Sequence, residues 1–107
     1  MAKSIKYYKL IRDKIPEIIE VTGKKACTKI LDSRTYKEEL DKKLLEEVQE
    51  YVEADNLEEL ADIVEVIYGI LQSKGVSIEE FEKVRLKKVE ERGAFEKRLF
   101  LDEVVEE

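Results

Sequence analysis

Four acidic residues fall into two pairs, Glu47 with Glu50 and Glu59 with Asp62, and the members of each pair are three positions apart. On a helix, residues at this spacing share a face with Cβ atoms about 5–6 Å apart, so each pair can present two carboxylates to one ion. The second pair stands in a strongly apolar stretch, LEELADIVEVIYGIL, over residues 57–71. Acidic side chains are rare in buried elements unless they are paired or bind a metal. The pattern therefore indicates a carboxylate metal site.

The types of ligand narrow the choice of metal. All-oxygen ligation suits Mg²⁺, Mn²⁺ or Ca²⁺ rather than zinc or copper. The chain contains no histidine, which argues against a di-iron bundle with Glu-x-x-His ligands. Calcium sensing lacks support because there is no EF-hand loop pattern. Mg²⁺ usually keeps several waters and shares its coordination with substrate phosphates, so we expect Mg²⁺, with Mn²⁺ as an alternative, and phosphate chemistry.

Simpler explanations exist for some of these acids. Glu59 is the third residue after Asn56 and could complete a helix-capping interaction. Glu47 and Glu50 could be ordinary solvated residues in a chain rich in acidic side chains. Asp62 is harder to explain in this way, because apolar residues flank it and Asp is a poor residue for a helix interior. Taken together, the four positions favour a metal site over surface charge.

Two long helices are expected to position the carboxylates. Asp32 or Ser33 can cap a helix that runs to about Ala54, and Asn56 can cap a second helix, Leu57 to about Ser73. The first helix has apolar residues at spacings of three and four that predict one buried stripe: Leu40, Leu44, Val48, Tyr51 and Val52. A connector of a few residues makes the helices antiparallel neighbours, which brings the two acidic pairs together. Such a cluster would repel itself strongly unless a cation lies within it.

The remaining segments complete an all-α fold. Pro16 suits the first turn of a short helix that ends at Gly23, and residues 24–31 could form a short strand or an extended piece. Ser77 opens a further helix with a capping box, which ends at Gly93. Its inner side is expected to carry Phe81, Val84, Leu86 and Val89. We predict an antiparallel helical bundle of about four helices with short extended N- and C-terminal segments.

Composition bounds the class of protein. The 107 residues suit a single helical domain over 1–107, and 43% apolar residues argue against disorder. The net charge of −6 argues against binding to a nucleic-acid polymer. No apolar run is long enough to span a membrane, and no signal region opens the chain, so a cytoplasmic protein is expected. Cys27, the one cysteine, is expected to be a buried structural thiol.

The acidic motif resembles that of a known family. The pattern E-E-V-Q-E over 46–50, followed by E-L-A-D over 59–62, resembles the MazG-like, or all-α nucleoside triphosphate pyrophosphohydrolase, superfamily. Two flanking stretches, YKLIRDKIP over 8–16 and ERGAFEKRLF over 91–100, look like its phosphoribosyl-ATP pyrophosphohydrolase-like branch. The resemblance covers nearly the whole chain. Its motifs are specific for the family and uninformative about the substrate.

This resemblance implies Mg²⁺-dependent cleavage between the α- and β-phosphates of a nucleotide, which yields a nucleoside monophosphate and pyrophosphate. A house-cleaning enzyme for non-standard nucleotides is expected rather than an enzyme of histidine synthesis. By motif position, the metal ligands would be Glu47, Glu50, Glu59 and Asp62. The catalytic set would be Glu46, Glu47 and Glu50, with Glu46 acting in an outer shell or on water.

Phosphate chemistry also needs cations that meet the remaining phosphate oxygens. The candidates near the two flanking motifs are Lys9, Arg12, Lys14, Lys88, Arg92, Lys97 and Arg98. Arg12 and Arg92 are preferred because the planar guanidinium matches a phosphate. Tyr7, Tyr8 and Phe95 could stack on a base, although core packing is the favoured role for each.

The alternative function is a non-catalytic helical oligomerisation or interaction module whose acidic faces only keep it in solution. The helix over 57–71 is apolar nearly all round, and one short bundle does not cover such a surface without a partner chain. A homodimer or a dimer of dimers is therefore expected under either function.

Overall fold

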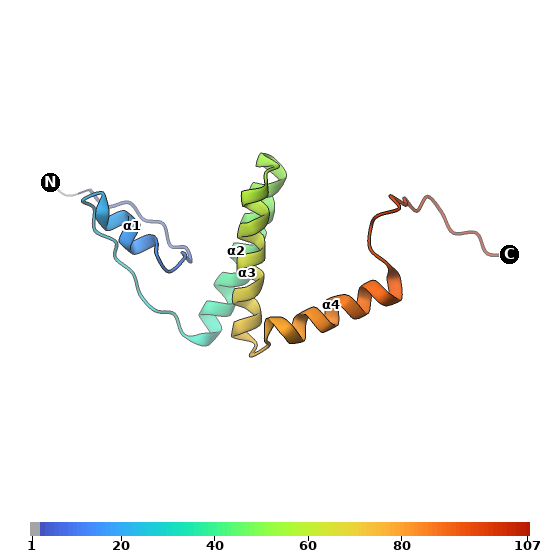
Figure 1. Ribbon diagram of the computed structural model, residues 1–107. Coiled ribbons are helices and arrows are strands. Elements are labelled where there is room, and N and C mark those ends of the chain that lie inside the picture. Colours follow the sequence, from blue (N-terminus) through green and yellow to red (C-terminus); the bar gives the residue numbers. More distant parts are fainter. Residues whose placement is uncertain (1–2) are drawn as a thin grey trace. The chain divides into compact units, whose positions relative to one another are not determined.

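The computed structural model describes residues 3–107, and within them the chain is all-α (Figure 1). The four helices are α1 (Ile15–Val21), α2 (Ser33–Ala54), α3 (Leu57–Ser73) and α4 (Ile78–Arg92). The described part of the chain contains no strand. This confirms the predicted fold class, including its helix count.

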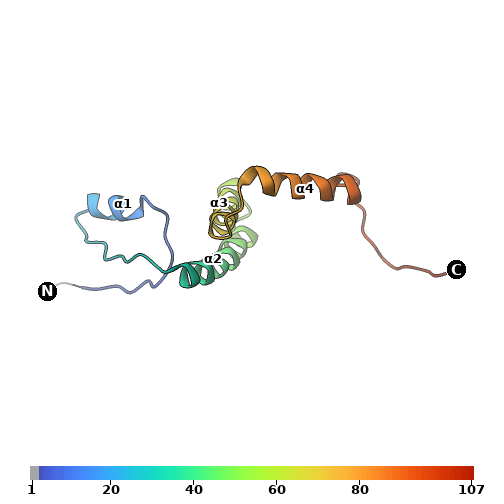
Figure 2. The ribbon, with the colours of Figure 1, turned by 90° about the horizontal axis from the view of Figure 1, so that it is seen from below.

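Helices α2 and α3 form a hairpin. The two helices pack against each other, and they lie side by side in both views (Figures 1 and 2). The Asp32 side chain accepts a hydrogen bond from the Thr35 amide at the start of α2. Asn56 caps α3 in the same way, as predicted. Asp55 adopts a left-handed conformation, with φ of 51°, that reverses the chain between the two helices.

The apolar part of the hairpin seam lies away from this turn. Leu40 on α2 and Val66 and Leu71 on α3 are the buried apolar residues. Gly69 allows the helices to approach, because a Cβ atom there would lie 3.0 Å from Leu40 Cδ2. The core of the described chain is therefore small and concentrated in the middle of one helix pair.

The predicted stripe on α2 is partly wrong. Leu40 is buried and Leu44 and Tyr51 are half-buried, but Val48 and Val52 are exposed. The physical reason is that, among the described helices, α3 alone packs on α2. The seam covers a narrow strip, and residues about a third of a turn away from it remain open to solvent.

The N-terminal region before α2 has little regular structure. Pro16 lies in the first turn of α1, as predicted. Residues 24–31 form neither helix nor strand, which agrees with the extended alternative. The expectation of a buried Cys27 is wrong, because this residue lies in that open segment and its side chain is exposed. Tyr7 and Tyr8 are exposed as well, so the predicted core packing is also wrong for them.

The chain separates into two compact units, Met1–Val76 and Ser77–Glu107. In the second unit, Ser77 accepts a hydrogen bond from the Glu80 amide and starts α4, and the helix stops at Gly93. No residue of α4 is buried, so the predicted inner side of that helix is half-covered at Phe81 and otherwise exposed. Phe95, expected to pack in a core, is exposed too. The single-domain assignment stays a prediction.

Within residues 3–107, no helix combines the length and the apolar character that crossing a bilayer requires.

Candidate metal centre

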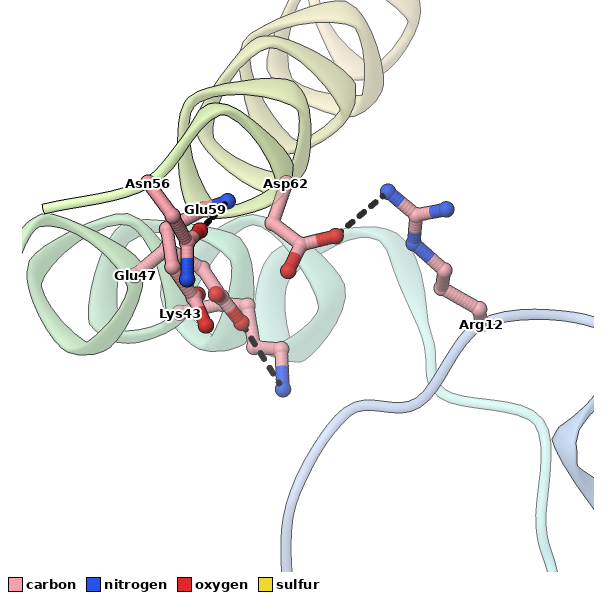
Figure 3. Close-up of polar contacts among 6 residues, drawn as sticks. All are labelled: Arg12, Lys43, Glu47, Asn56, Glu59 and Asp62. Atoms are coloured by element: carbon pink, nitrogen blue, oxygen red, sulfur yellow. Dashed lines mark hydrogen bonds and ion pairs between the residues drawn. The ribbon is translucent and has the colours of Figure 1, made fainter. Parts of the chain in front are cut away.

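Three of the four predicted metal ligands come together where the hairpin seam approaches the turn. One carboxylate oxygen from each of Glu47, Glu50 and Glu59 lies within 4.8 Å of the others. The first two come from α2 and the third from α3, so the antiparallel pairing of the helices builds the cluster. Figure 3 draws Glu47 on α2 and Glu59 on α3 with their side chains close together.

Glu47 is the most deeply placed member. It is 7% exposed, and its Oε2 atom is buried without a hydrogen-bond partner. Its Oε1 atom lies 3.6 Å from Lys43 Nζ, one helical turn earlier (Figure 3). One ammonium group therefore compensates one side of this carboxylate, and the other side points into the seam unpaired. Burying a charged oxygen in this way is costly unless a cation completes its surroundings.

Glu59 is held by the start of α3. Its backbone amide donates a hydrogen bond of 2.9 Å to the Asn56 side chain, which fixes the first turn of the helix (Figure 3). Its Oε2 atom is buried and has no hydrogen-bond partner. The backbone of this residue takes part in capping, while one oxygen of its side chain remains available to a ligand.

The electrostatics agree with a cluster whose negative charge is only partly compensated. Burial is the main cause that raises the pKa of Glu47, and the neighbouring Glu50 raises it further. Burial also raises the pKa of Glu59, followed by repulsion from Glu50 and Asp62. Both groups therefore hold protons more tightly than a free glutamate. A bound cation would reverse that effect, because it favours the charged form.

Asp62 lies close to the three glutamates but outside their closest grouping. Its charge contributes to the raised pKa of Glu47 and of Glu59, which places it within electrostatic reach of both. Its Oδ1 atom accepts a hydrogen bond of 3.0 Å from Arg12 Nη2 (Figure 3). The predicted fourth ligand is thus paired with a predicted phosphate-binding arginine.

The other predicted site residues do not belong to the glutamate cluster. Glu46 is exposed, with Lys43 Nζ 4.0 Å from its carboxylate. The Lys9 ammonium lies 5.6 Å from the ring centre of Tyr7, and Lys14 occupies the N-cap position of α1. In the second unit, Lys88 is an exposed residue of α4. A hollow of about 380 Å³ in that unit is lined by residues that include Arg92, Phe95, Lys97 and Arg98.

Lys43 is not among the residues that the motif predicts for the site. Its position four residues before Glu47 is the signal that could have identified it, since residues at that spacing face each other on a helix. Its side chain is 19% exposed, which is low for a lysine.

The donor set fits a hard divalent cation. Ligand oxygens at about 2.1 Å from Mg²⁺ stand at most roughly 4.2 Å apart, across the octahedron. The three glutamate oxygens lie within 4.8 Å of one another, which is close to this limit. Three carboxylates also leave coordination positions for water and for phosphate oxygens.

Comparisons with known proteins give no match to this chain: no protein-family model matches it, and neither do the curated proteins or the solved structures. Membership of the MazG-like superfamily therefore stays a prediction that rests on the sequence motifs.

Proposed function

We propose that the chain is a Mg²⁺-dependent nucleoside triphosphate pyrophosphohydrolase that removes non-standard nucleotides. The observation that carries the proposal is the unpaired, buried carboxylate oxygen of Glu47 beside Glu50 and Glu59. Folding brings these charges together at a cost, and a bound cation would offset that cost. A carboxylate-held Mg²⁺ is a common partner of phosphate groups, and the MazG-like motifs point to the same chemistry.

Each residue has a defined task in this proposal. Glu47, Glu50, Glu59 and Asp62 would hold the ion, which would neutralise charge on phosphate oxygens and lower the pKa of a water molecule. Glu46 is exposed beside the cluster and orients a water molecule for attack on the α-phosphorus. The guanidinium group of Arg12 binds a phosphate oxygen of the substrate.

The test is product analysis over a panel of standard and modified nucleoside triphosphates with Mg²⁺. Cleavage between the α- and β-phosphates releases pyrophosphate, so a phosphate assay responds only after inorganic pyrophosphatase is added. Cleavage between the β- and γ-phosphates gives a signal without that enzyme. We expect the first pattern, with a nucleoside monophosphate as the second product.

Matched variants distinguish the acids of the cluster from acids elsewhere on the surface. Asp62→Asn and Glu59→Gln are expected to abolish turnover, whereas Glu53→Gln on the exposed side of α2 is expected to preserve it. Absence of turnover for every nucleotide, with Asp62→Asn indistinguishable from the wild type in Mg²⁺ binding, would refute the proposal.

A second candidate function is a helical oligomerisation module, which the exposed apolar side chains of the hairpin favour. On α2 these side chains are Leu45, Val48 and Val52, and on α3 they are Leu60, Val64 and Tyr68. Each set recurs at helical spacings of three or four. Around each helix axis, both sets are rotated away from the seam in the same sense. In an antiparallel hairpin they therefore lie on one side, and Glu50 and Asp62 lie on the other side.

Such an apolar face is expected to be covered by a second copy, as a homodimer or a dimer of dimers, whether or not the chain is an enzyme. Light scattering at micromolar concentration should give at least twice the mass of the chain. Val52→Glu should shift the mass toward the monomer, and Ile30→Glu, in the open segment before α2, should not. Calorimetry then separates the two functions, because only the enzyme binds Mg²⁺ in a way that Glu59→Gln abolishes.

A further inference from the structure

We propose that Arg12 and a metal ion are alternative partners of Asp62. The N-terminal segment is then a strap from which Asp62 is released when a cation binds at the glutamates. The released strap carries Arg12 to the phosphates of the substrate. The strap is defined here as residues 3–14. The inference rests on the proposed function, because it assigns a regulatory step to the same site.

The first observation is the singular character of the Arg12–Asp62 contact. Among the ion pairs of the described residues, the others join residues three or four apart on one helix. Arg12 and Asp62 are 50 positions apart, and their hydrogen bond of 3.0 Å ties the strap to α3 (Figure 3). This contact therefore links the strap to a distant helix, which the local pairs do not.

The second observation is that Asp62 faces two incompatible demands. In Figure 3 the Asp62 carboxylate is drawn between the Arg12 guanidinium group and the side chains of Glu47 and Glu59. Glu47 is more than nine-tenths buried and has an unpaired oxygen, and the charge of Asp62 helps to raise its pKa. A cation held by these glutamates would attract the Asp62 carboxylate as well. The same cation would repel the guanidinium group of Arg12, so the metal and the arginine compete for one aspartate.

The third observation is that the existing pair is weak enough to exchange. The Arg12 side chain is 57% exposed and the Asp62 side chain is 40% exposed. Exposed ion pairs are worth about 1 kcal/mol or less, so a divalent ion can displace the arginine at little cost. Once released, Arg12 stays near the site on its strap, where its planar fork can bind a phosphate oxygen bidentately.

The competition predicts effects of opposite sign from one substitution. Arg12→Ala should tighten the binding of Mn²⁺ alone about two- to fivefold, since Asp62 no longer has to be freed from an exposed ion pair. The same variant should weaken the binding of inorganic tripolyphosphate to the Mn²⁺-loaded protein by about tenfold, because hydrogen bonds between charged groups are lost. Both affinities can be measured by isothermal titration calorimetry, without turnover.

Three further variants identify the cause. In an Asp62→Asn background, Arg12→Ala should no longer change the Mn²⁺ affinity. Arg12→Lys keeps the charge and should leave the Mn²⁺ affinity near that of the wild type, but weaken tripolyphosphate binding because the fork is lost. Lys6→Ala removes one positive charge from the same strap and should change neither affinity.

The outcomes separate this inference from the proposed function. If Mn²⁺ binds the wild type and Arg12→Ala equally, the competition is refuted and the metal site remains. If Arg12→Ala leaves tripolyphosphate binding unchanged, or tripolyphosphate does not bind, the transfer of Arg12 to phosphate is refuted. If Mn²⁺ binds none of the proteins, the metal site fails and the strap mechanism fails with it.

Discussion

The two parts of the α2–α3 seam contrast sharply, although the same two helices form both. In the middle, Leu40 packs against α3 so closely that a Cβ atom at Gly69 would touch it at 3.0 Å. Nearer the turn, the seam is filled by Glu47 and Glu59, each with a buried oxygen that has no hydrogen-bond partner. One part is packed with apolar side chains, and the other carries carboxylate oxygens without hydrogen-bond partners.

This difference shows where the molecule accepts a cost. An apolar pair at the positions of Glu47 and Glu59 would extend the core and stabilise the hairpin. The two glutamates instead destabilise the hairpin. The pKa of each is raised, which means that its surroundings disfavour the charged form. Sites that depart from the rules of packing are expected to be functional ones. Changes in the two parts should therefore affect different properties.

The largest expected effect is on catalysis, through Glu59→Gln. If Glu59 binds the metal as proposed, this substitution should lower kcat/KM by about 100-fold or more, since even the hydrogen-bond partners of ligands are worth about 10–100-fold. In the absence of metal, the same variant should melt at a higher temperature than the wild type, because one desolvated, repelled charge is gone. Differential scanning fluorimetry with and without Mg²⁺ measures the second effect. If the variant is inactive and also less stable than the wild type without metal, the Glu59 charge does not destabilise the metal-free fold.

The next effect is on folding, through Leu40→Ala in the packed part. Truncation of a buried leucine leaves a cavity and should lower the free energy of unfolding by about 2–5 kcal/mol. Chemical denaturation followed by circular dichroism, in the presence of a chelator, measures it. Leu99→Ala, in the exposed C-terminal tail, is the matched control and should change stability by less than about 0.5 kcal/mol. Equal effects of the two substitutions would argue against the hairpin core.

A third prediction concerns pH and the Glu47 carboxyl. Its pKa is raised in the folded state, mainly by burial, above the ordinary value of 4.5. The folded protein therefore prefers the protonated group, so this stabilising contribution is complete below pH 4.5 and is lost as the pH rises through the raised pKa. Relative to Glu47→Gln, the metal-free wild type should lose stability over that range. Mg²⁺ should reduce the loss.

Glu82 provides a control of opposite sign. Its hydrogen bonds with Arg85 lower its pKa below 4.5, so its contribution is present above that pH and is lost as the pH falls. Melting curves of Glu47→Gln and Glu82→Gln across the acidic range should therefore diverge from the wild type in opposite directions. Parallel curves would show that Glu47 is not in an unfavourable environment.

The same contrast explains what could be predicted from sequence. Local signals were sufficient for the helices, because Asp32, Asn56 and Ser77 each cap a helix through a short-range hydrogen bond. The acidic cluster was also predictable, since a short turn and helical spacing bring Glu47 and Glu59 together. These features depend on neighbours within a few residues or across one turn.

Features that depend on distant packing were not predictable. The exposure of Val52 and Cys27 reflects which surfaces find a partner within the chain, and apolar periodicity cannot report that. The Arg12–Asp62 pair joins residues 50 positions apart, and no spacing rule links them. The predicted grouping of all four acids therefore missed that Asp62 already has a cation.

The smallest expected effect concerns the turn that joins α2 to α3, next to the acidic part of the seam. Asp55 ends α2 with φ of 51° and ψ of 51°, a left-handed conformation that costs about 1–2 kcal/mol for residues with a Cβ atom, and less for Asp. Asp55→Gly should stabilise the protein by about 0.5–1 kcal/mol. It also removes a negative charge from a helix C-terminus, so Asp55→Asn, which removes the charge alone, measures the electrostatic share.

Neither substitution touches the carboxylate cluster, so the Mn²⁺ affinity measured by calorimetry should stay at the wild-type value in both. A gain in stability from Asp55→Gly with unchanged metal binding would show that the turn sets the pairing of the helices independently of the charge they bring together. If Asp55→Gly instead weakened metal binding, the rigidity of the turn would itself be part of the site, because a looser turn would let Glu59 move away from Glu47. Metal binding in the acidic part of the seam would then depend on the stability of the hairpin, as the packing of the apolar part does.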